Sequence, residues 1–252
     1  MNPFSLDGET ALITGGGTGL GLGMARSFVE AGARVILIGR NDQRLRAACG
    51  DLGPSAAWIG HDITRLSEAG DLIRRASSVF PDPPGILINN AGTHLKKSAV
   101  ETSSDEFEAL MRTHVSAGHA LAAAMLPGML QRGRGSIVFI ASMASFLGVP
   151  NVFAYSAAKT AVLGMTRALA GEVSGRGVRV NAIAPGWIET DMVRKALDND
   201  PVRKAKVLGR TPLGSLGQPA DVGAAAVYLC SPAARFVTGT TLVVDGGASV
   251  GF

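Results

Sequence analysis

Seven short runs of apolar, mostly β-branched residues recur along the chain, and stretches with helical spacing separate most of them. The runs are Thr10–Thr14, Arg34–Gly39, Ala56–Gly60, Gly85–Asn89, Ser136–Ser142, Val178–Ile183 and Thr241–Asp245. Most are apolar throughout, which is typical of strands covered by helices on both faces. Leu20, Met24 and Phe28 predict one buried helical stripe between the first two runs. The pattern predicts an α/β fold with a doubly wound, parallel, seven-stranded sheet in a single domain of residues 1–252.

Composition excludes several classes of protein. The 24 basic and 20 acidic residues give a formal net charge of +4, which is too diffuse, with only 5% aromatic residues, to suggest a nucleic-acid surface. Cys49 and Cys230 form no CxxC pair, and no His/Cys cluster has zinc-ligand spacing, so no metal is expected. The longest apolar stretch, His119–Leu130, contains Pro127 and is shorter than the roughly 20 residues of a membrane span. Because Met1–Ala25 also lacks the basic start of a signal peptide, we expect a cytoplasmic protein with no membrane partner.

A glycine-rich turn follows the first expected strand and opens the first expected helix. It reads Thr14-Gly15-Gly16-Gly17-Thr18-Gly19-Leu20-Gly21. Glycines let the backbone approach a pyrophosphate, which then meets the free N–H groups of the helix N-terminus. The alternative is a plain tight turn, but the position between strand and helix favours a Rossmann-like dinucleotide site. The expected contacts are Gly15, Gly17, Thr18, Gly19, Leu20 and Gly21.

The end of the second expected strand bears on the choice of cofactor. A site for NAD(H) places an acid here to hold the ribose 2′-hydroxyl. This chain has Arg40 instead, followed by Asn41, and a guanidinium binds a 2′-phosphate through charge-assisted hydrogen bonds. We therefore favour NADP(H) over NAD(H). Asp42 is a weak indication in the other direction, and the alternative for Arg40 is a solvated position at the start of a helix.

A tyrosine and a lysine lie four residues apart on one expected helix face. They are Tyr155 and Lys159, and Ser142 precedes them at the end of the fifth expected strand. Such a pair alone would more often belong to a surface helix. Together with the glycine-rich turn, it predicts a catalytic group of Ser142, Tyr155 and Lys159.

Further motifs complete a set that is specific in combination. Besides the turn and the catalytic group, it comprises Asp62, Asn89-Asn90-Ala91-Gly92, Asn181, Pro185-Gly186 and Asp245-Gly246-Gly247. On these residues the chain, from Leu6 to Gly247, resembles the short-chain dehydrogenase/reductase family. The resemblance implies cofactor contacts at Asp62 and Ile63 for the adenine, Asn90, Ala91 and Gly92 for the ribose, Tyr155 and Lys159, and Pro185, Gly186, Ile188 and Thr190 near the nicotinamide. Asn89-Asn90 as a strand cap and Asp245 as a strand end are the structural alternatives.

The side chains indicate the chemistry. Hydride reduction leaves negative charge on the substrate oxygen, so Tyr155 is the expected acid and its phenolate the base of the reverse reaction. A free phenol has a pKa of ~10, and an ammonium about 4 Å away is worth roughly 4 kcal/mol, or about three pKa units. We therefore expect Lys159, with help from the charge of the oxidised nicotinamide, to bring the pKa of Tyr155 near ~7. Ser142 would donate a hydrogen bond to the same oxygen.

One position departs from the family pattern. His114 stands where the family usually has an asparagine that holds a water linked to the lysine. An imidazole both donates and accepts, so His114 is a candidate relay residue with a pKa near ~6.5. The alternative is a buried neutral histidine bonded to a backbone carbonyl.

A long segment between the sixth and seventh expected strands, about residues 187–217, is the expected lid. Its part Met192–Arg210 carries six basic residues against Asp198 and Asp200, and Lys96 and Lys97 add to the same field. Such a flap would attract an anionic substrate, whereas the alternative is a solvated helix face. Trp187, at the start of the lid, is expected either on the substrate or in the core.

The leading functional hypothesis is an NADP(H)-dependent oxidoreductase that interconverts a secondary alcohol and a ketone, on a sugar acid or polyol. A 3-oxoacyl carrier-protein reductase is the alternative within the same class, and a non-catalytic nicotinamide-binding scaffold is the alternative of another class. The resemblance further implies a homotetramer built through helices equivalent to Ser104–Gln131 and Ser156–Glu172 and through the C-terminal strand.

Overall fold

A computed structural model describes residues 2–251 and contains one sheet of seven parallel strands. The strands are β1 (Thr10–Thr14), β2 (Arg34–Gly39), β3 (Ala56–Gly60), β4 (Ile86–Asn89), β5 (Gly135–Ile140), β6 (Val178–Pro185) and β7 (Thr241–Val244). Their order is β3-β2-β1-β4-β5-β6-β7, so the chain reverses direction across the sheet between β1 and β4. At the centre, Leu12 of β1 is paired with Ile36 of β2 and Leu87 of β4. The predicted doubly wound sheet is confirmed.

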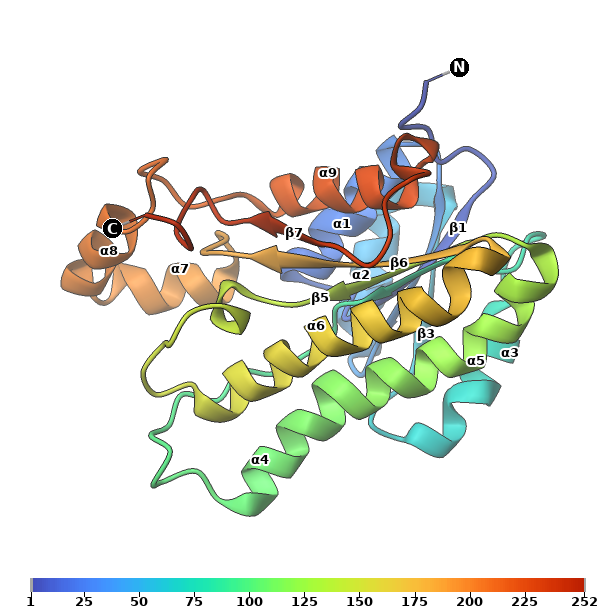
Figure 1. The fold of residues 1–252 in the computed structure, drawn as a ribbon. Helices are drawn as coiled ribbons and strands as arrows, with labels where there is room; N and C mark the ends of the chain where they lie inside the picture. Colours follow the sequence, from blue (N-terminus) through green and yellow to red (C-terminus); the bar gives the residue numbers. More distant parts are fainter. Residues whose placement is uncertain (1, 252) are drawn as a thin grey trace.

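Nine helices longer than one turn are found within residues 2–251 (Figure 1). They are α1 (Gly19–Glu30), α2 (Asp42–Leu52), α3 (Ala69–Ala76), α4 (Ser104–Met111), α5 (Ala117–Arg132), α6 (Phe153–Val173), α7 (Asp191–Asp198), α8 (Pro201–Gly209) and α9 (Pro219–Cys230). Helices α1, α2 and α9 cover one face of the sheet, and α3, α5 and α6 cover the other. Alternate strand residues enter the two cores, as Leu12 and Ile13 do from β1.

The predicted stripe of α1 faces the sheet. Met24 and Phe28 are fully buried and Leu20 packs against the same core. Helix α1 lies directly against α9, because a Cβ added at Gly23 would come within 2.4 Å of Pro219. Glycine here permits close approach of the two helices, which burial of their apolar sides stabilises.

Three strand ends differ from the sequence prediction. Strand β5 ends at Ile140, two residues before Ser142, whose hydroxyl instead accepts a hydrogen bond from Ala144 N–H and caps a short 3₁₀ turn. Strand β6 continues to Pro185, which tolerates the missing N–H because the strand ends there. Strand β7 stops before Asp245, whose carboxylate accepts the N–H groups of two following residues, Gly247 and Ser249. Side-chain hydrogen bonds of this kind compete with the sheet and terminate it.

The segment 187–217 folds into α7 and α8 and returns to its starting point. Glu189 N–H donates to the Gly217 carbonyl at 2.7 Å, and Gly217 N–H donates to the Trp187 carbonyl at 3.0 Å. Ile188 and Gly217 form an isolated parallel bridge at this neck. The two ends of the segment are therefore paired with each other at the carboxyl end of β6. Its helices lie beyond the tips of the β5 and β6 arrows (Figure 1). None of the helices described within residues 2–251 is both long and apolar enough to cross a bilayer.

Candidate active site

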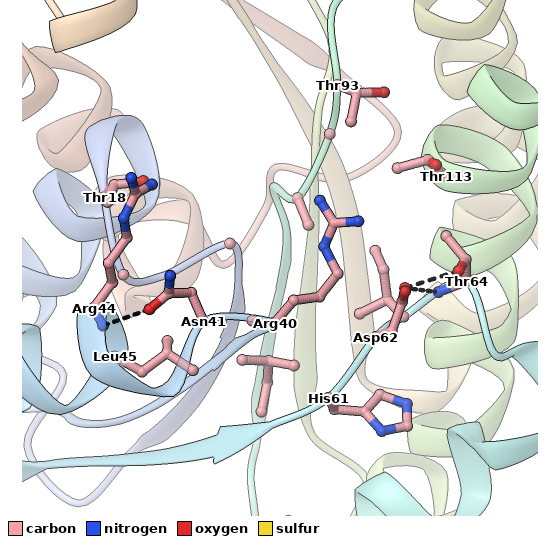
Figure 2. A pocket seen from close by; sticks show the side chains of 17 residues that line it. Thr18, Arg40, Asn41, Arg44, Leu45, His61, Asp62, Thr64, Thr93 and Thr113 are labelled. Carbon is pink, nitrogen blue, oxygen red and sulfur yellow. Dashed lines mark hydrogen bonds between the residues drawn. The ribbon is translucent and has the colours of Figure 1, made fainter. Parts of the chain in front are cut away.

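A cavity of about 250 Å³ opens at the carboxyl edge of the sheet, where the strand order reverses between β1 and β4 (Figure 2). This position is where open α/β sheets bind their ligands. The predicted residues that line it are Gly15, Gly17, Thr18, Arg40, Asp62, Ile63, Ala91 and Gly92. Sequence reasoning missed other lining residues, among them Arg44, His61, Thr64, Thr93 and Thr113, because no motif marks them.

The glycine-rich turn leaves the N-terminus of α1 free to bind an anion. Thr18 occupies the N-cap but makes no side-chain hydrogen bond to the helix, and the first turn of α1 contains no acid. Gly15 has φ of +65°, a conformation that other residues rarely adopt. A Cβ at Gly21 would lie 2.1 Å from the Gly15 carbonyl oxygen, so the helix and the turn pack backbone to backbone. Uncapped N–H groups and the positive end of the helix dipole suit the pyrophosphate of a dinucleotide.

Asn90 holds this turn in place. Its side-chain amide donates to the Thr14 carbonyl at 2.8 Å, and its backbone N–H donates to Thr14 Oγ1 at 3.0 Å. Thr14 in turn donates to the Ile88 carbonyl at 3.2 Å. Asn90 therefore links β4 to β1 and is not among the residues that line the cavity, whereas its neighbours Ala91 and Gly92 are. Contact of Asn90 with a ribose remains a prediction.

Two arginines enter the cavity from the segment after β2. Figure 2 shows Arg40 pointing into the cavity and Arg44 running up the side that carries Thr18. Asn41 caps α2 by accepting a hydrogen bond from Arg44 N–H at 2.9 Å. Asp42 does not line the cavity, since its carboxylate faces Gly60 on β3. Asp42, the acid that weakened the sequence argument for NADP(H), therefore lies outside this cavity.

Asp62 lies on the opposite wall and has a fixed orientation. Its carboxylate accepts hydrogen bonds from Thr64 N–H at 3.0 Å and from the Thr64 hydroxyl at 2.8 Å. These bonds, with the positive charge of Arg40, hold the pKa of Asp62 below its usual value. Ile63 lines the cavity beside it. Asp62 is thus an ionised acceptor at neutral pH.

Ser142, in the turn after β5, and Tyr155 and Lys159, on α6, converge next to the cavity. The ammonium of Lys159 is buried, donates to the Ile140 carbonyl at 2.6 Å, and lies 5.7 Å from the centroid of the Tyr155 ring. Ser142 is buried and its hydroxyl interacts with the phenol of Tyr155. The structure therefore brings together the three predicted catalytic side chains.

The expected depression of the Tyr155 pKa is wrong for the chain alone. Burial raises the pKa of Tyr155, and the hydrogen bond with Ser142 opposes this only in part. Lys159 is buried as well, which lowers the pKa of its ammonium to about 7. The sequence argument assumed a permanent cation beside the phenol, and desolvation of both groups removes that assumption.

The surroundings of His114 match a buried neutral histidine bonded to a backbone carbonyl more closely than a relay residue. It is buried in a single π-helical turn, Arg112–Ser116, with Nε2 2.8 Å from the Thr93 carbonyl oxygen. Burial, followed by the charge of Lys159, lowers the pKa of His114 to about 4, so it does not titrate near the value expected for a free imidazole. It still shares with Lys159 and Asn89 a small cavity of about 10 Å³. Its part in proton transfer remains a prediction.

The residues expected around the nicotinamide lie where β6 ends. Gly186 packs on Asp245, since a Cβ there would come within 2.6 Å of it. Thr190 caps α7 by accepting from Val193 N–H at 3.3 Å and lies beside Gly19 of the glycine-rich turn. Pro185 and Ile188 are buried at the same edge. The two ends of the proposed cofactor site therefore meet across the sheet edge.

Some of the basic side chains of the segment 187–217 form ion pairs with neighbouring acids. Arg194 pairs with Glu189 at 3.4 Å, and Lys204 pairs with Asp198 at 3.0 Å. Outside the lid, Lys97 pairs with Glu106 at 2.7 Å, so it contributes less to the expected positive field. The net field around the site is therefore carried by fewer side chains than composition indicates.

Comparison with a family model and with related proteins agrees with the resemblance found in the sequence. A family model described as enoyl-(acyl carrier protein) reductase matches residues 15–249. The chain is 41% identical over 250 residues to galactitol 2-dehydrogenase (L-tagatose-forming) of Cereibacter sphaeroides, covering 98% of this chain and 97% of the relative. It is 35% identical to 3-oxoacyl-[acyl-carrier-protein] reductase of Vibrio harveyi, covering 97% and 98% of the two chains.

A solved structure also resembles this chain over its whole length. A gluconate 5-dehydrogenase from Burkholderia cenocepacia, in complex with NADP and tartrate, superposes with a TM-score of 0.93 at 34% identity. The alignment covers 100% of this chain and 99% of that one. With its glycine-rich turn, its Ser142–Tyr155–Lys159 group and these relatives, the chain belongs to the short-chain dehydrogenase/reductase family.

Proposed function

We propose that the protein uses NADP(H) to interconvert a secondary alcohol and a ketone on a polyhydroxylated substrate, a polyol or a sugar acid. As a family member, the chain is an oxidoreductase of the CH–OH/C=O group. The observation that carries the proposal is the convergence of Ser142, Tyr155 and Lys159 beside a cavity that has the shape and donors of a dinucleotide site. The galactitol and gluconate dehydrogenases among the relatives support the substrate class.

The dinucleotide fits the residues present. The uncapped start of α1 would hold its pyrophosphate, and Asp62 and Ile63 would lie beside its adenine. When bound, the nicotinamide gives or takes a hydride and carries a positive charge in its oxidised form. All other steps belong to side chains of this protein.

The proton is handled by Tyr155. In reduction, Tyr155 Oη donates its proton to the substrate oxygen, and Ser142 Oγ donates a hydrogen bond to the same oxygen. The raised pKa of the phenol keeps it protonated, which suits this role as an acid. In oxidation the phenolate is the base, and a protonated Lys159 stabilises it. Lys159 also orients the edge of β5 through the Ile140 carbonyl.

Tyr155→Phe tests this mechanism, because it removes one hydroxyl and retains the ring. We expect turnover with every carbonyl substrate to be lost and the affinity for NADPH, followed by its fluorescence, to stay within about twofold. Retained turnover would refute the mechanism. The same panel separates the alternatives, since preferred turnover of acetoacetyl thioesters would indicate a 3-oxoacyl reductase. Cofactor binding without turnover on any substrate in the unmodified protein would indicate a scaffold.

The preference for NADP(H) is supported by Arg40 and Arg44. Both line the cavity, and Asp62 is the only acidic side chain among its lining residues in the described chain. Each guanidinium can form charge-assisted bonds to a 2′-phosphate. We expect Arg40→Asp to lower the ratio of NADP to NAD efficiency roughly 10- to 100-fold. Arg46→Asp, on α2 and outside the cavity, is the matched control, and an unaltered ratio in Arg40→Asp would overturn the preference.

A homotetramer is the proposed assembly. Large apolar side chains remain exposed near the expected contact surfaces, with Phe153 at 56% on α6, Phe236 at 99% before β7 and Val250 at 81% after it. Burial of such side chains is a usual driving force for association. Light scattering coupled to size-exclusion chromatography measures the mass directly, and a monomer at micromolar concentration would contradict the proposal.

A further inference from the structure

Two segments far apart in the sequence meet above the phenol of Tyr155. The loop after β4 places the ring of His94 4.8 Å from the ring of Tyr155, centroid to centroid. The segment after β6 contributes Trp187, which is half-buried. The guanidinium of Arg203, on α8, lies 5.6 Å from the centroid of the Trp187 ring. The side chains of His94, Trp187 and Arg203 form one wall near Tyr155, because His94 contacts the Tyr155 ring and the charge of Arg203 acts on His94.

Arg203 belongs to this wall and not only to the lid surface. Its side chain is half-buried, and its charge reaches His94, where with Lys96 it contributes to the lowered pKa of the imidazole. Burial is the larger cause of that shift. A neutral imidazole and a fixed guanidinium therefore lie together beside Tyr155.

The guanidinium of Arg203 is not paired with an acidic side chain in the part of the chain that the structure describes. Within residues 2–251 no carboxylate lies within salt-bridge distance of Arg203, because nearby acids have other partners. Glu189 and Asp191 lie against Arg194, and Asp198 lies against Lys204. Asp200 caps α8 by accepting a hydrogen bond from the backbone N–H of Arg203 at 2.9 Å. An arginine that no carboxylate engages is available to bind an anionic ligand through charge-assisted hydrogen bonds.

We propose that Arg203 binds a carboxylate of the substrate, with the reacting carbon held beside the hydroxyl of Tyr155, so that the enzyme acts on hydroxy or oxo carboxylic acids. The inference rests on the proposed oxidoreductase function and narrows its substrate class from polyols and sugar acids to the acids. The guanidinium lies over the ring of Trp187, and this cation–π contact helps to hold it in position for a carboxylate. His94 offers a neutral nitrogen to a substrate hydroxyl.

The position also separates this charge from those that hold the cofactor. Arg40 and Arg44 lie on the cavity wall after β2, whereas Arg203 is on α8, beyond the end of β6. Substitution of Arg203 should therefore change the preference among substrates and leave the preference between cofactors unchanged.

The kinetic test compares five- and six-carbon aldonic acids with the alditols of the same skeleton. We expect Arg203→Met to lower the kcat/KM for the acids relative to the alditols roughly 10- to 100-fold, mainly through KM, and Arg203→Lys to restore part of the loss. Arg210→Met is the matched control, because it removes one exposed charge from the same segment. Equal losses in Arg203→Met and Arg210→Met would show a diffuse field, and equal losses on acids and alditols would show a structural role. Either result overturns the proposal.

A binding measurement distinguishes failure of this inference from failure of the proposed function. Trp58 and Trp187 are the two tryptophans of the chain, so Trp58→Phe leaves fluorescence that reports on Trp187 alone. Gluconate and the other aldonic acids of the panel should change this fluorescence at concentrations where the alditols do not, and Arg203→Met should abolish the change. If that holds but the unmodified protein turns over none of the panel, the carboxylate site stands and the proposed function fails. Turnover without any acid-specific fluorescence change overturns the carboxylate site alone.

Discussion

The buried ammonium of Lys159 gives the stability of the folded chain a specific dependence on pH. Burial lowers its pKa from 10.5 to about 7, so between these values the unfolded chain binds a proton that the folded chain does not. Stability must then rise as the pH rises through this window. Below about pH 7 both states are protonated and the full cost of the buried charge is present. From about pH 7 to about pH 9.5 the gain amounts to about 3 kcal/mol.

Lys159→Met removes the titrating group and keeps most of the apolar stem. We expect the free energy of unfolding of the unmodified protein, from urea titrations without added cofactor, to rise by about 3 kcal/mol more than that of the variant over this pH interval. The comparison at one pH is less informative, because the variant also loses the hydrogen bond to the Ile140 carbonyl.

Lys206→Met, on the exposed side of α8, is the control and should leave the pH dependence of the unmodified protein unchanged. All three proteins are measured at one concentration, since assembly would add to the apparent stability. If Lys159→Met retains the same pH dependence as the unmodified protein, the desolvation argument for Lys159 is refuted.

Three other predictions follow from the same region and from the core. His114→Asn should leave the pH dependence of kcat/KM between about pH 6 and pH 10 unchanged, because the imidazole, with its pKa of about 4, is neutral throughout; a limb near ~6.5 that disappears in the variant would contradict this. Gly92→Ala should lower stability by about 1–3 kcal/mol in thermal or urea unfolding, because the new Cβ would lie 2.3 Å from His114 Cε1, and the loss should shrink when His114→Asn is added; additive effects would exclude this clash. Cys230, whose pKa burial raises to about 12, should resist iodoacetamide in the native state while Cys49 reacts first, as peptide mass spectrometry shows; early labelling of Cys230 would refute its burial.

The sheet and its connections could be predicted from sequence because continuous apolar runs and glycine signals are local. Strands β1, β2 and β3 match their predicted bounds. The end of β5 was missed because the hydroxyl of Ser142 caps a turn instead of continuing the ladder, and such competition depends on the neighbouring chain. The position of a buried strand is therefore more predictable than the residue at which it stops.

The sequence predicted many of the residues that form the site, but it did not predict their pKa values. Tyr155, Lys159 and the glycine-rich turn carry recognisable spacing, whereas Arg44 lines the cavity only because α2 begins at Asp42 and directs it there. The pKa of Tyr155 moved in the direction opposite to the prediction. Spacing shows which charges are close, but desolvation depends on how completely the rest of the fold excludes water.

The neck at Ile188 and Gly217 has a consequence for protein engineering. The two ends of the 31 residues numbered 187–217 are joined by hydrogen bonds at the sheet edge. The segment between them can therefore be exchanged as one unit. Exchange of its interior for that of a relative need not disturb the seven strands, provided that Gly217 is kept where a Cβ would strike Ile188 at 2.7 Å. Such a loop allows residues near the substrate to change while the seven strands and the Ser142–Tyr155–Lys159 group are kept.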